Sequence, residues 1–158
     1  MVSAPLPTSG PHGDSKAKLR LWIRLLRASR LIEANVRERL KTQFAATLPR
    51  FDVLAALYRQ REGMLMSEIS RFLMVSNGNV TGIVDRLVAE RLVVRAQRNG
   101  DRRTSFVKLT NKGVAKFEDM AEAHEDWIDE LLADVSVRDA NNLSAKLKSF
   151  RSNWEGGT

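Results

Sequence analysis

Four polar residues near the middle of the chain have side chains suited to hydrogen bonding with nucleic-acid bases. They stand in the stretch SNGNVTGIVDRL, residues 76–87. The amides of Asn77 and Asn79 match the N6 and N7 atoms of adenine, and the hydroxyls of Ser76 and Thr81 suit phosphates or bases. We therefore take these four residues as candidate DNA contacts.

The same stretch has the apolar spacing of a helix, yet its first half consists of poor helix formers. Gly78 and Gly82 are the clearest examples. A helix that enters the major groove must bring its N-terminal turns close to the base edges, and small residues permit that approach. The alternative is a plain turn before a short buried helix. The apolar positions of the helix are Val80, Ile83, Val84 and Leu87.

A basic β-hairpin follows. Residues 92–96 and 105–109 alternate with a period of two, and an Asn-Gly dipeptide lies between them. An arginine at such a tip would lie in or along the minor groove, and Asp101 could orient it through a charge-assisted hydrogen bond. The alternative is a set of solvated loop charges. The arginines are Arg98, Arg102 and Arg103.

The composition excludes several kinds of chemistry. The chain has no cysteine and two histidines, which rules out disulfides, thiolate metal sites and a Cys–His nucleophile. We expect no metal, no cofactor and no enzymatic activity. No apolar run approaches the roughly 18 residues of a membrane span, and the N-terminal segment lacks the pattern of a secretory signal. We therefore expect no membrane partner and a cytoplasmic protein.

The charge distribution points to an anionic partner. The net charge is +7, with a pI near 10.2. Residues 16–50 carry ten basic and two acidic side chains, residues 76–110 carry seven and three, and residues 111–134 carry two and eight. The alternative is a set of ordinary solvated helix faces.

The order short helix, tight turn, second helix and basic hairpin predicts a winged helix-turn-helix. The fold class is mainly α with a small β-hairpin wing (α+β) and long N- and C-terminal dimerisation helices. Proline, glycine and serine dominate the first residues. The predicted domains are a disordered tail (1–15), a dimerisation helix (16–48), a DNA-binding lobe (49–110) and C-terminal dimerisation helices (111–158). Within the lobe we expect helices from Pro49 to about Gly63, over 66–74 and over 76–91.

Dimerisation follows from the two ends of the chain. The first helix and the last, which ends in Phe150 and Trp154, carry more apolar surface than so small a core can cover. Packing against a second copy would hide it. The alternative is that both helices close the core of the monomer.

The stretches SNGNVTGIVDRLVAERLV and GDRRTSFVKLTNKG resemble those of the MarR family of transcriptional regulators. The hairpin matches that family's wing pattern at Asp101, Arg103, Leu109, Thr110 and Gly113. The resemblance spans roughly residues 16–154. It implies a homodimer that binds a pseudo-palindromic double-stranded DNA operator and usually represses, with a small-molecule pocket between the dimerisation helices and the DNA-binding lobe.

One position departs from the family pattern. Such proteins often have Thr three residues before the Glu that opens the short helix, whereas here Leu65 precedes Glu68. Ser67 is an alternative cap.

The candidate effector contacts are Trp22, Arg30, Phe51 and His124. Arg30 continues the apolar stripe of the first helix, so it either pairs with Glu33 or faces an anionic ligand. His124 is either a core or interface histidine or a ligand contact. The segment LWIRLLRASRLIEANVRERL resembles family members that regulate aromatic-acid catabolism, some of which sense CoA thioesters. The resemblance thus implies an aromatic acid or an aromatic acyl-CoA as effector.

Together these observations predict a ligand-responsive DNA-binding regulator, most simply a repressor of aromatic-compound catabolism genes. The alternative is a winged-helix module for protein–protein interaction. Such a module would not need Asn77, Asn79 and two arginines at the wing tip.

Overall fold

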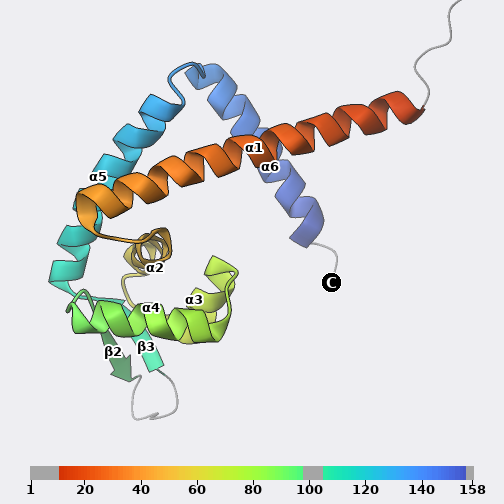
Figure 1. Cartoon of the computed structure of the whole chain (residues 1–158). Coiled ribbons are helices and arrows are strands. Elements are labelled where there is room, and N and C mark those ends of the chain that lie inside the picture. The colour runs from red at the N-terminus through yellow and green to blue at the C-terminus, as the bar shows by residue number, and fades with distance from the viewer. Residues whose placement is uncertain (1–10, 98–104, 156–158) are drawn as a thin grey trace, which may run out of the picture. The chain divides into compact units, whose positions relative to one another are not determined.

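The computed structural model describes residues 11–97 and 105–155, and in this part of the chain it shows six helices and three short strands (Figure 1). The chain divides after Ala121, inside α5, into two compact units. The predicted fold class, mainly helical with a small β wing, is confirmed. The elements are α1 (Pro11–Phe44), α2 (Leu48–Arg59), β1 (Met64–Leu65), α3 (Met66–Leu73), α4 (Asn77–Ala89), β2 (Val93–Gln97), β3 (Ser105–Leu109), α5 (Asn111–Leu131) and α6 (Val137–Glu155).

The sheet of the first unit is antiparallel, with strand order β1-β3-β2. Val93 lies opposite Leu109 and Gln97 opposite Ser105, so β2 and β3 form the predicted hairpin. The two-residue strand β1 was not predicted, because two residues are too few to show an alternating pattern. It pairs Met64 with Val107.

Aliphatic side chains at the predicted helical spacing form the core of this unit. Burying one such side chain completely contributes roughly 1.5–3 kcal/mol. The back half of α4 is therefore strongly attached, whereas its first turns supply only Val80 to the core. The buried aliphatic residues include Leu54 and Leu57 of α2, Ile69 of α3, Val80, Val84 and Leu87 of α4, and Val93 and Val107 of the sheet.

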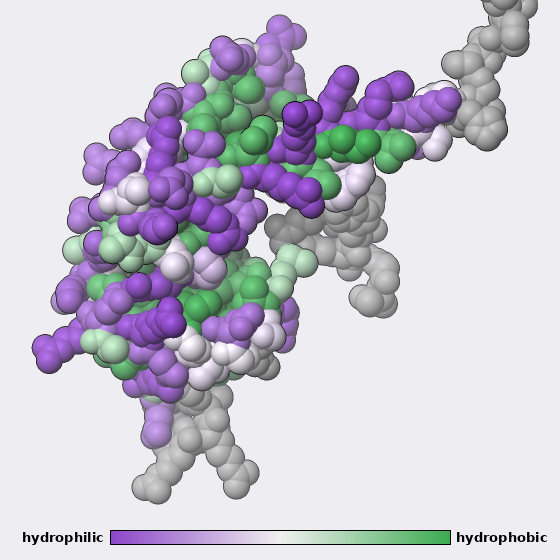
Figure 2. All heavy atoms as spheres, in the orientation of Figure 1, coloured by the Kyte–Doolittle hydropathy of each residue, from purple (hydrophilic) through white to green (hydrophobic). Residues whose placement is uncertain are grey.

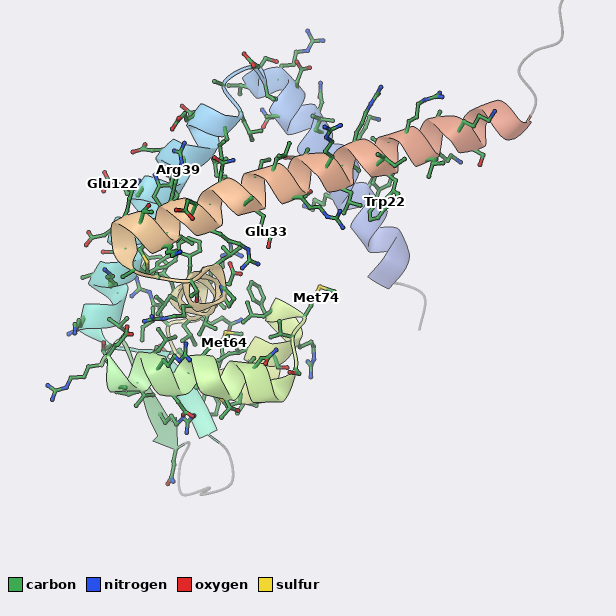
Figure 3. All side chains as sticks on the ribbon, in the orientation of Figure 1. Trp22, Glu33, Arg39, Met64, Met74 and Glu122 are labelled. Carbon is green, nitrogen blue, oxygen red and sulfur yellow. The ribbon has the colours of Figure 1, made fainter. Side chains whose placement is uncertain are left out.

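Helix α1 begins earlier than the predicted dimerisation helix (16–48). It begins at Pro11, within the segment predicted as a disordered tail, and ends at Phe44. Proline fits the first turn of a helix because its missing N–H has no partner there in any case. Val36 and Leu40, near the C-terminal end, are buried, whereas Trp22 is 58% exposed. Figure 3 shows Trp22 on the N-terminal half of α1.

The predicted end of the second helix is wrong. Helix α2 stops at Arg59, with Gln60 as its C-terminal cap, and Gly63 lies in the turn that follows. Gly63 has a φ of +103°, which other residues rarely adopt. The glycine therefore shapes the entry into β1 instead of ending the helix.

The second unit contains the end of α5 and the whole of α6. The Ser136 side chain donates to the Asp139 carboxylate (2.8 Å), and the backbone N–H of Asp139 donates to the Ser136 hydroxyl (3.1 Å). This reciprocal cap fixes the start of α6. Leu143, Leu147 and Phe150 of α6 are exposed.

The surface view shows apolar side chains among the charges along α1 (Figure 2). In the described ranges 11–97 and 105–155, no helix has the length and apolarity to cross a membrane.

Candidate nucleic-acid interface

Helix α4 has a buried face and a small, polar outward face. Ser76, Asn79 and Thr81 are exposed, whereas Val80 on the opposite side is buried. Asn77 is the first residue of the helix. The structure thus brings the exposed candidate contacts together on the first two turns of one helix.

The two glycines of α4 border open space. Apart from its chain neighbours and the backbone of its own helix, a Cβ added at Gly78 or at Gly82 would meet no atom of the described residues within 4 Å. Neither glycine is therefore required by the packing of the free chain, although each lowers helix stability by roughly 1 kcal/mol relative to alanine. The space above them is available to an approaching molecule.

Ser76 is the N-cap residue of α4, but its side chain makes no capping hydrogen bond within the described chain. Its backbone carbonyl accepts from the N–H groups of Asn79 (3.1 Å) and Val80 (3.2 Å). The Ser76 hydroxyl is exposed and could form a hydrogen bond with a bound molecule.

The C-terminal end of α4 is held by contacts that the sequence did not reveal. Glu90 caps the helix, and its side chain forms an ion pair with Arg50 at the start of α2. Lys112 of α5 donates to the backbone carbonyl of Glu90 (3.0 Å). No local pattern signals these contacts, because the partners are 40 and 22 residues apart.

The Thr110 and Gly113 positions of the wing pattern join the hairpin to α5. The Thr110 hydroxyl donates to the carbonyl of Arg91 (2.7 Å) and accepts from the N–H of Gly113 (2.9 Å). Gly113 is buried against the backbone of Leu92. These two residues therefore fix the segment between α4 and β2 to the start of α5.

The strands of the wing are tied to α4 by an ion pair between Arg95 of β2 and Asp85 (2.6 Å). Sequence reasoning did not single out either residue. Arg98, Asp101, Arg102 and Arg103 lie outside the described residues, in the connection between β2 and β3.

Helix α3 begins at Met66, so the alternative cap at Ser67 is wrong. Leu65 has no side-chain acceptor, but its backbone N–H donates to Glu68 (2.8 Å), which supplies half of a capping box. In the turn to α4, the Ser70 hydroxyl donates to the carbonyl of Val75 (2.6 Å). Met74 adopts left-handed backbone angles in this turn and projects outward (Figure 3).

The candidate effector residues have different surroundings. Trp22 and Arg30 are exposed on α1. Of the two alternatives for Arg30, the pair with Glu33 is wrong, because Glu33 binds Arg37 one turn later (2.9 Å), the favourable i,i+4 arrangement. Phe51 is buried, and its ring centroid lies 5.5 Å from that of Phe117.

His124 belongs to the second unit. It is half-buried, and burial lowers the pKa of its imidazole. Its ring meets that of Trp127 edge to face, with the centroids 6.5 Å apart. It also lines a cavity of about 450 Å³ with Ile128 and Leu132.

No group of three or more carboxylates and histidines suited to a metal occurs among the residues the structure describes. The candidate contacts on α4 are amides, hydroxyls and bare glycines, on a helix anchored at its C-terminal end.

Known proteins resemble the chain along most of its length. The MarR family profile matches residues 47–104. The HTH-type transcriptional regulator MhqR of Bacillus subtilis is 28% identical over 134 residues, covering 85% of this chain and 91% of MhqR. A crystal structure of a MarR family transcriptional regulator from Silicibacter pomeroyi is 32% identical, with a TM-score of 0.75, and covers 93% of this chain and 99% of its own.

A mutant MarR from E. coli complexed with operator DNA shares the fold, with a TM-score of 0.73, 24% identity and coverage of 85% of this chain and 95% of that one. The relatives are transcriptional regulators, not enzymes. The chain accordingly belongs to the MarR family of winged-helix transcriptional regulators.

Proposed function

We propose that the protein binds a double-stranded DNA operator with the first two turns of α4 in the major groove. The observation that carries this proposal is the open space over Gly78 and Gly82, on the same helix face as Asn79. A helix laid into the groove needs its backbone near the base edges, and a bare N-terminal surface permits this. The anchored C-terminal end would hold the helix against the DNA.

The proposed contacts divide into two kinds. Asn77 and Asn79 read bases, most simply adenine, through their amides. Ser76 and Thr81 contact phosphates or bases, and Arg98, Arg102 and Arg103 lie along the adjacent minor groove with Asp101 orienting one guanidinium. The exposed positions on α4 and the basic composition of the connection between β2 and β3 support this division.

A homodimer would present two such helices. Leu19, Trp22 and Ile23 of α1 are all more than half exposed, at 56%, 58% and 53%, and Leu143, Leu147 and Phe150 of α6 are also exposed. Exposed apolar side chains at helical spacing are typical of a protein interface. We propose that both helices pack against a second copy, which would place the half-sites of a palindromic operator about 10 bp apart.

We also propose that a small organic anion releases the protein from its operator. A ligand beside α1, near Trp22, Arg30 and Phe51, would hold the two DNA-binding lobes at a spacing that the operator does not fit. An aromatic acid or its CoA thioester suits the aromatic and cationic side chains. In this form the protein is a cytoplasmic repressor of aromatic-compound catabolism genes.

A mobility-shift assay tests the DNA-binding proposal. The probe is the intergenic DNA beside the protein's own gene, and unlabelled probe and unrelated DNA serve as competitors. We expect a complex that the unlabelled probe removes at a far lower concentration than unrelated DNA. Equal competition by both would contradict sequence-specific binding. Adding aromatic acids and their thioesters to the same assay tests release.

A further inference from the structure

The outward face of α4 carries one acidic residue on a line of small ones. The opposite side of the helix holds the fully buried Val80, Val84 and Leu87. Residues spaced four, three and four positions apart lie above one another on a helix. The four exposed residues on this line are Gly78, Gly82, Asp85 and Ala89. Asp85 therefore supplies the one side chain on the line that can form a hydrogen bond.

The Asp85 carboxylate is held through one of its two oxygens. A terminal guanidinium nitrogen of Arg95 in β2 donates to Oδ1 of Asp85 (2.6 Å). Among the residues that the structure describes, this is the one hydrogen bond that the carboxylate accepts. The Asp85 side chain is 57% exposed and that of Arg95 is 43% exposed. Oδ2 can therefore accept a hydrogen bond from a bound molecule.

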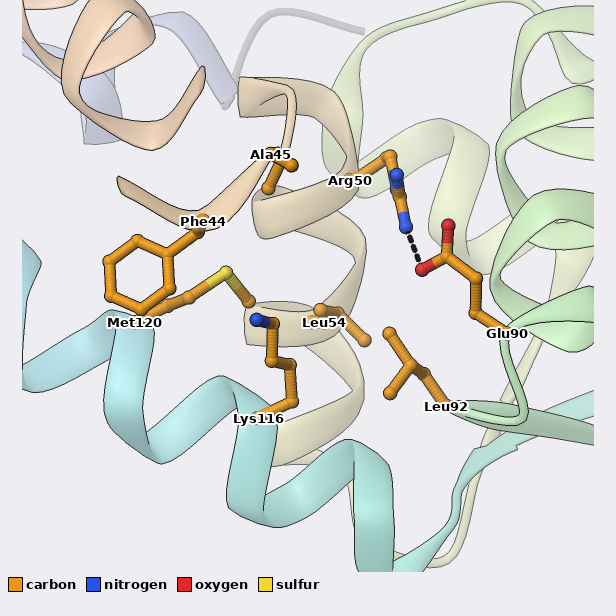
Figure 4. Close-up of a pocket in the computed structure, with 9 residues that line it drawn as sticks. Phe44, Ala45, Arg50, Leu54, Glu90, Leu92, Lys116 and Met120 are labelled. Atoms are coloured by element: carbon orange, nitrogen blue, oxygen red, sulfur yellow. Dashed lines mark hydrogen bonds and ion pairs between the residues drawn. The ribbon is translucent and has the colours of Figure 1, made fainter. Parts of the chain in front are cut away.

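The part of α4 that carries Asp85 is fixed to the rest of the lobe. Leu87, two residues further along, is fully buried. Five residues beyond Asp85, Glu90 is paired with Arg50 of α2 (Figure 4). A side chain that discriminates between bases must be held in place by its surroundings, because a loose contact loses discrimination. Asp85 meets this condition.

A carboxylate on a DNA-binding face needs a specific hydrogen-bond donor. The phosphates repel its charge, and the O6 and N7 atoms of guanine and the O4 atom of thymine are acceptors like itself. Cytosine presents its N4 amino group in the major groove, and aspartate or glutamate can accept from it. Adenine also presents an amino group, but the acceptor N7 lies beside it. Cytosine is therefore the base that suits Asp85 best.

We infer that Asp85 reads one cytosine in each half-site of the operator, with Oδ2 accepting a hydrogen bond from the N4 amino group. Arg95 is a positioning residue, because it holds Oδ1 and offsets the charge that the phosphates would repel. This inference rests on the proposed function, in which Gly78 and Gly82 bring the same line of α4 to the base edges. It adds a second kind of base to the adenines proposed for the asparagines.

Selection from a pool of random DNA duplexes tests the readout without a known operator. The full chain is incubated with the pool, and the bound duplexes are separated by mobility shift and sequenced. We expect the wild type to enrich cytosine at one position in each half-site. Asp85→Ala should lose the preference at that position, and Asp85→Asn should shift it to adenine, whose N6 and N7 atoms match an amide. The other enriched positions should stay the same.

Affinities for two defined duplexes measure the size of the effect. One duplex is the best selected sequence, and the other has a T·A pair in place of the C·G pair in one half-site. The wild type should bind the first roughly fivefold to tenfold more tightly, as one base contact implies, and Asp85→Ala should bind both equally. Glu62→Ala removes an exposed negative charge outside α4 and should keep the wild-type ratio.

A purely structural ion pair predicts a different result. Asp85→Ala would then weaken binding to both duplexes and leave their ratio unchanged, which would overturn the inference. Arg95→Met should bring the ratio toward one, and Arg95→Lys, which keeps the charge, should restore much of it. A full wild-type ratio in Arg95→Met would overturn the positioning role of Arg95.

The selection also separates this inference from the proposed function. Enriched sequences with no position that depends on Asp85 would overturn the cytosine contact and leave sequence-specific DNA binding in place. A pool with no enriched sequence at all would overturn both.

Discussion

A methyl group added at Gly113 would lie 1.9 Å from the carbonyl oxygen of Leu92. The obstructing atom is backbone, which has no rotamer with which to move away. We expect Gly113→Ala to lower the free energy of unfolding by about 2–3 kcal/mol or more, as other overpacked sites do. Urea unfolding followed by circular dichroism measures the change. Gly82→Ala, which meets open space, is the matched control, and an equal loss in both variants would contradict the close contact.

Gly78→Ala should separate stability from DNA binding. The new methyl group meets nothing beyond its own helix in residues 11–97 and 105–155, so the helix should gain roughly 0.5–1 kcal/mol. The same methyl group should hold α4 away from the base edges and weaken operator binding. Ala89→Gly, on an exposed site at the other end of α4, should lower stability without that loss of affinity. Thermal unfolding and mobility shifts on both variants give the comparison.

We expect Asn79→Ala and Arg103→Ala to impair DNA binding in different ways. The first should lose discrimination at one position in each half-site, worth about 1–3 kcal/mol for a good bidentate contact. The second should weaken binding to many sequences and reduce the slope of log affinity against log salt concentration by roughly 0.9, the effect of one phosphate contact. Operator libraries and a salt series measure the two effects. An unchanged salt slope in Arg103→Ala would show that this residue does not contact phosphate.

Asp52 should make stability depend on pH. Burial raises the pKa of its carboxyl, against the opposing effect of Arg37, and Glu33 raises it further. The folded chain thus holds this proton more tightly than the unfolded chain, whose carboxyl titrates near 3.8. The associated stabilisation is complete below that pH and is lost as the pH rises through the folded-state pKa.

Asp52→Asn should therefore be more stable than wild type at pH 7, and the difference should shrink as the pH falls toward 4. Urea unfolding at a series of pH values measures it. Asp119→Asn, on the exposed side of α5, is the control for a general effect of removing a negative charge. A difference between Asp52→Asn and wild type that does not vary with pH would exclude Asp52 as the titrating group.

Local and periodic features were predictable from the sequence. Val80, Val84 and Leu87 revealed α4 because a buried helix face repeats its apolar residues at a fixed interval. The glycines of the same helix stood out because they oppose helix formation. The Arg50–Glu90 pair was not predictable, since two residues 40 positions apart meet through packing that no local pattern encodes.

Two local features were predicted wrongly because the sequence fitted more than one local arrangement. Glu33 has arginines at i−3 and i+4, and side-chain direction on the helix decides in favour of Arg37. Gly63 follows a helix closely enough to suggest a cap, but its backbone conformation serves the turn into β1.

The uneven attachment of α4 has a consequence for its motion. Its C-terminal end is tied by Glu90 and Lys112, whereas its first turn has no side-chain cap in the described chain and carries Gly78. Backbone amide hydrogens of residues 77–82 should therefore exchange with solvent much faster than those of residues 84–90. The free energy of local opening is lowest where few contacts hold the backbone. The end of α4 that we propose to face the operator would then be the end able to adjust, turn by turn, to the local shape of the groove.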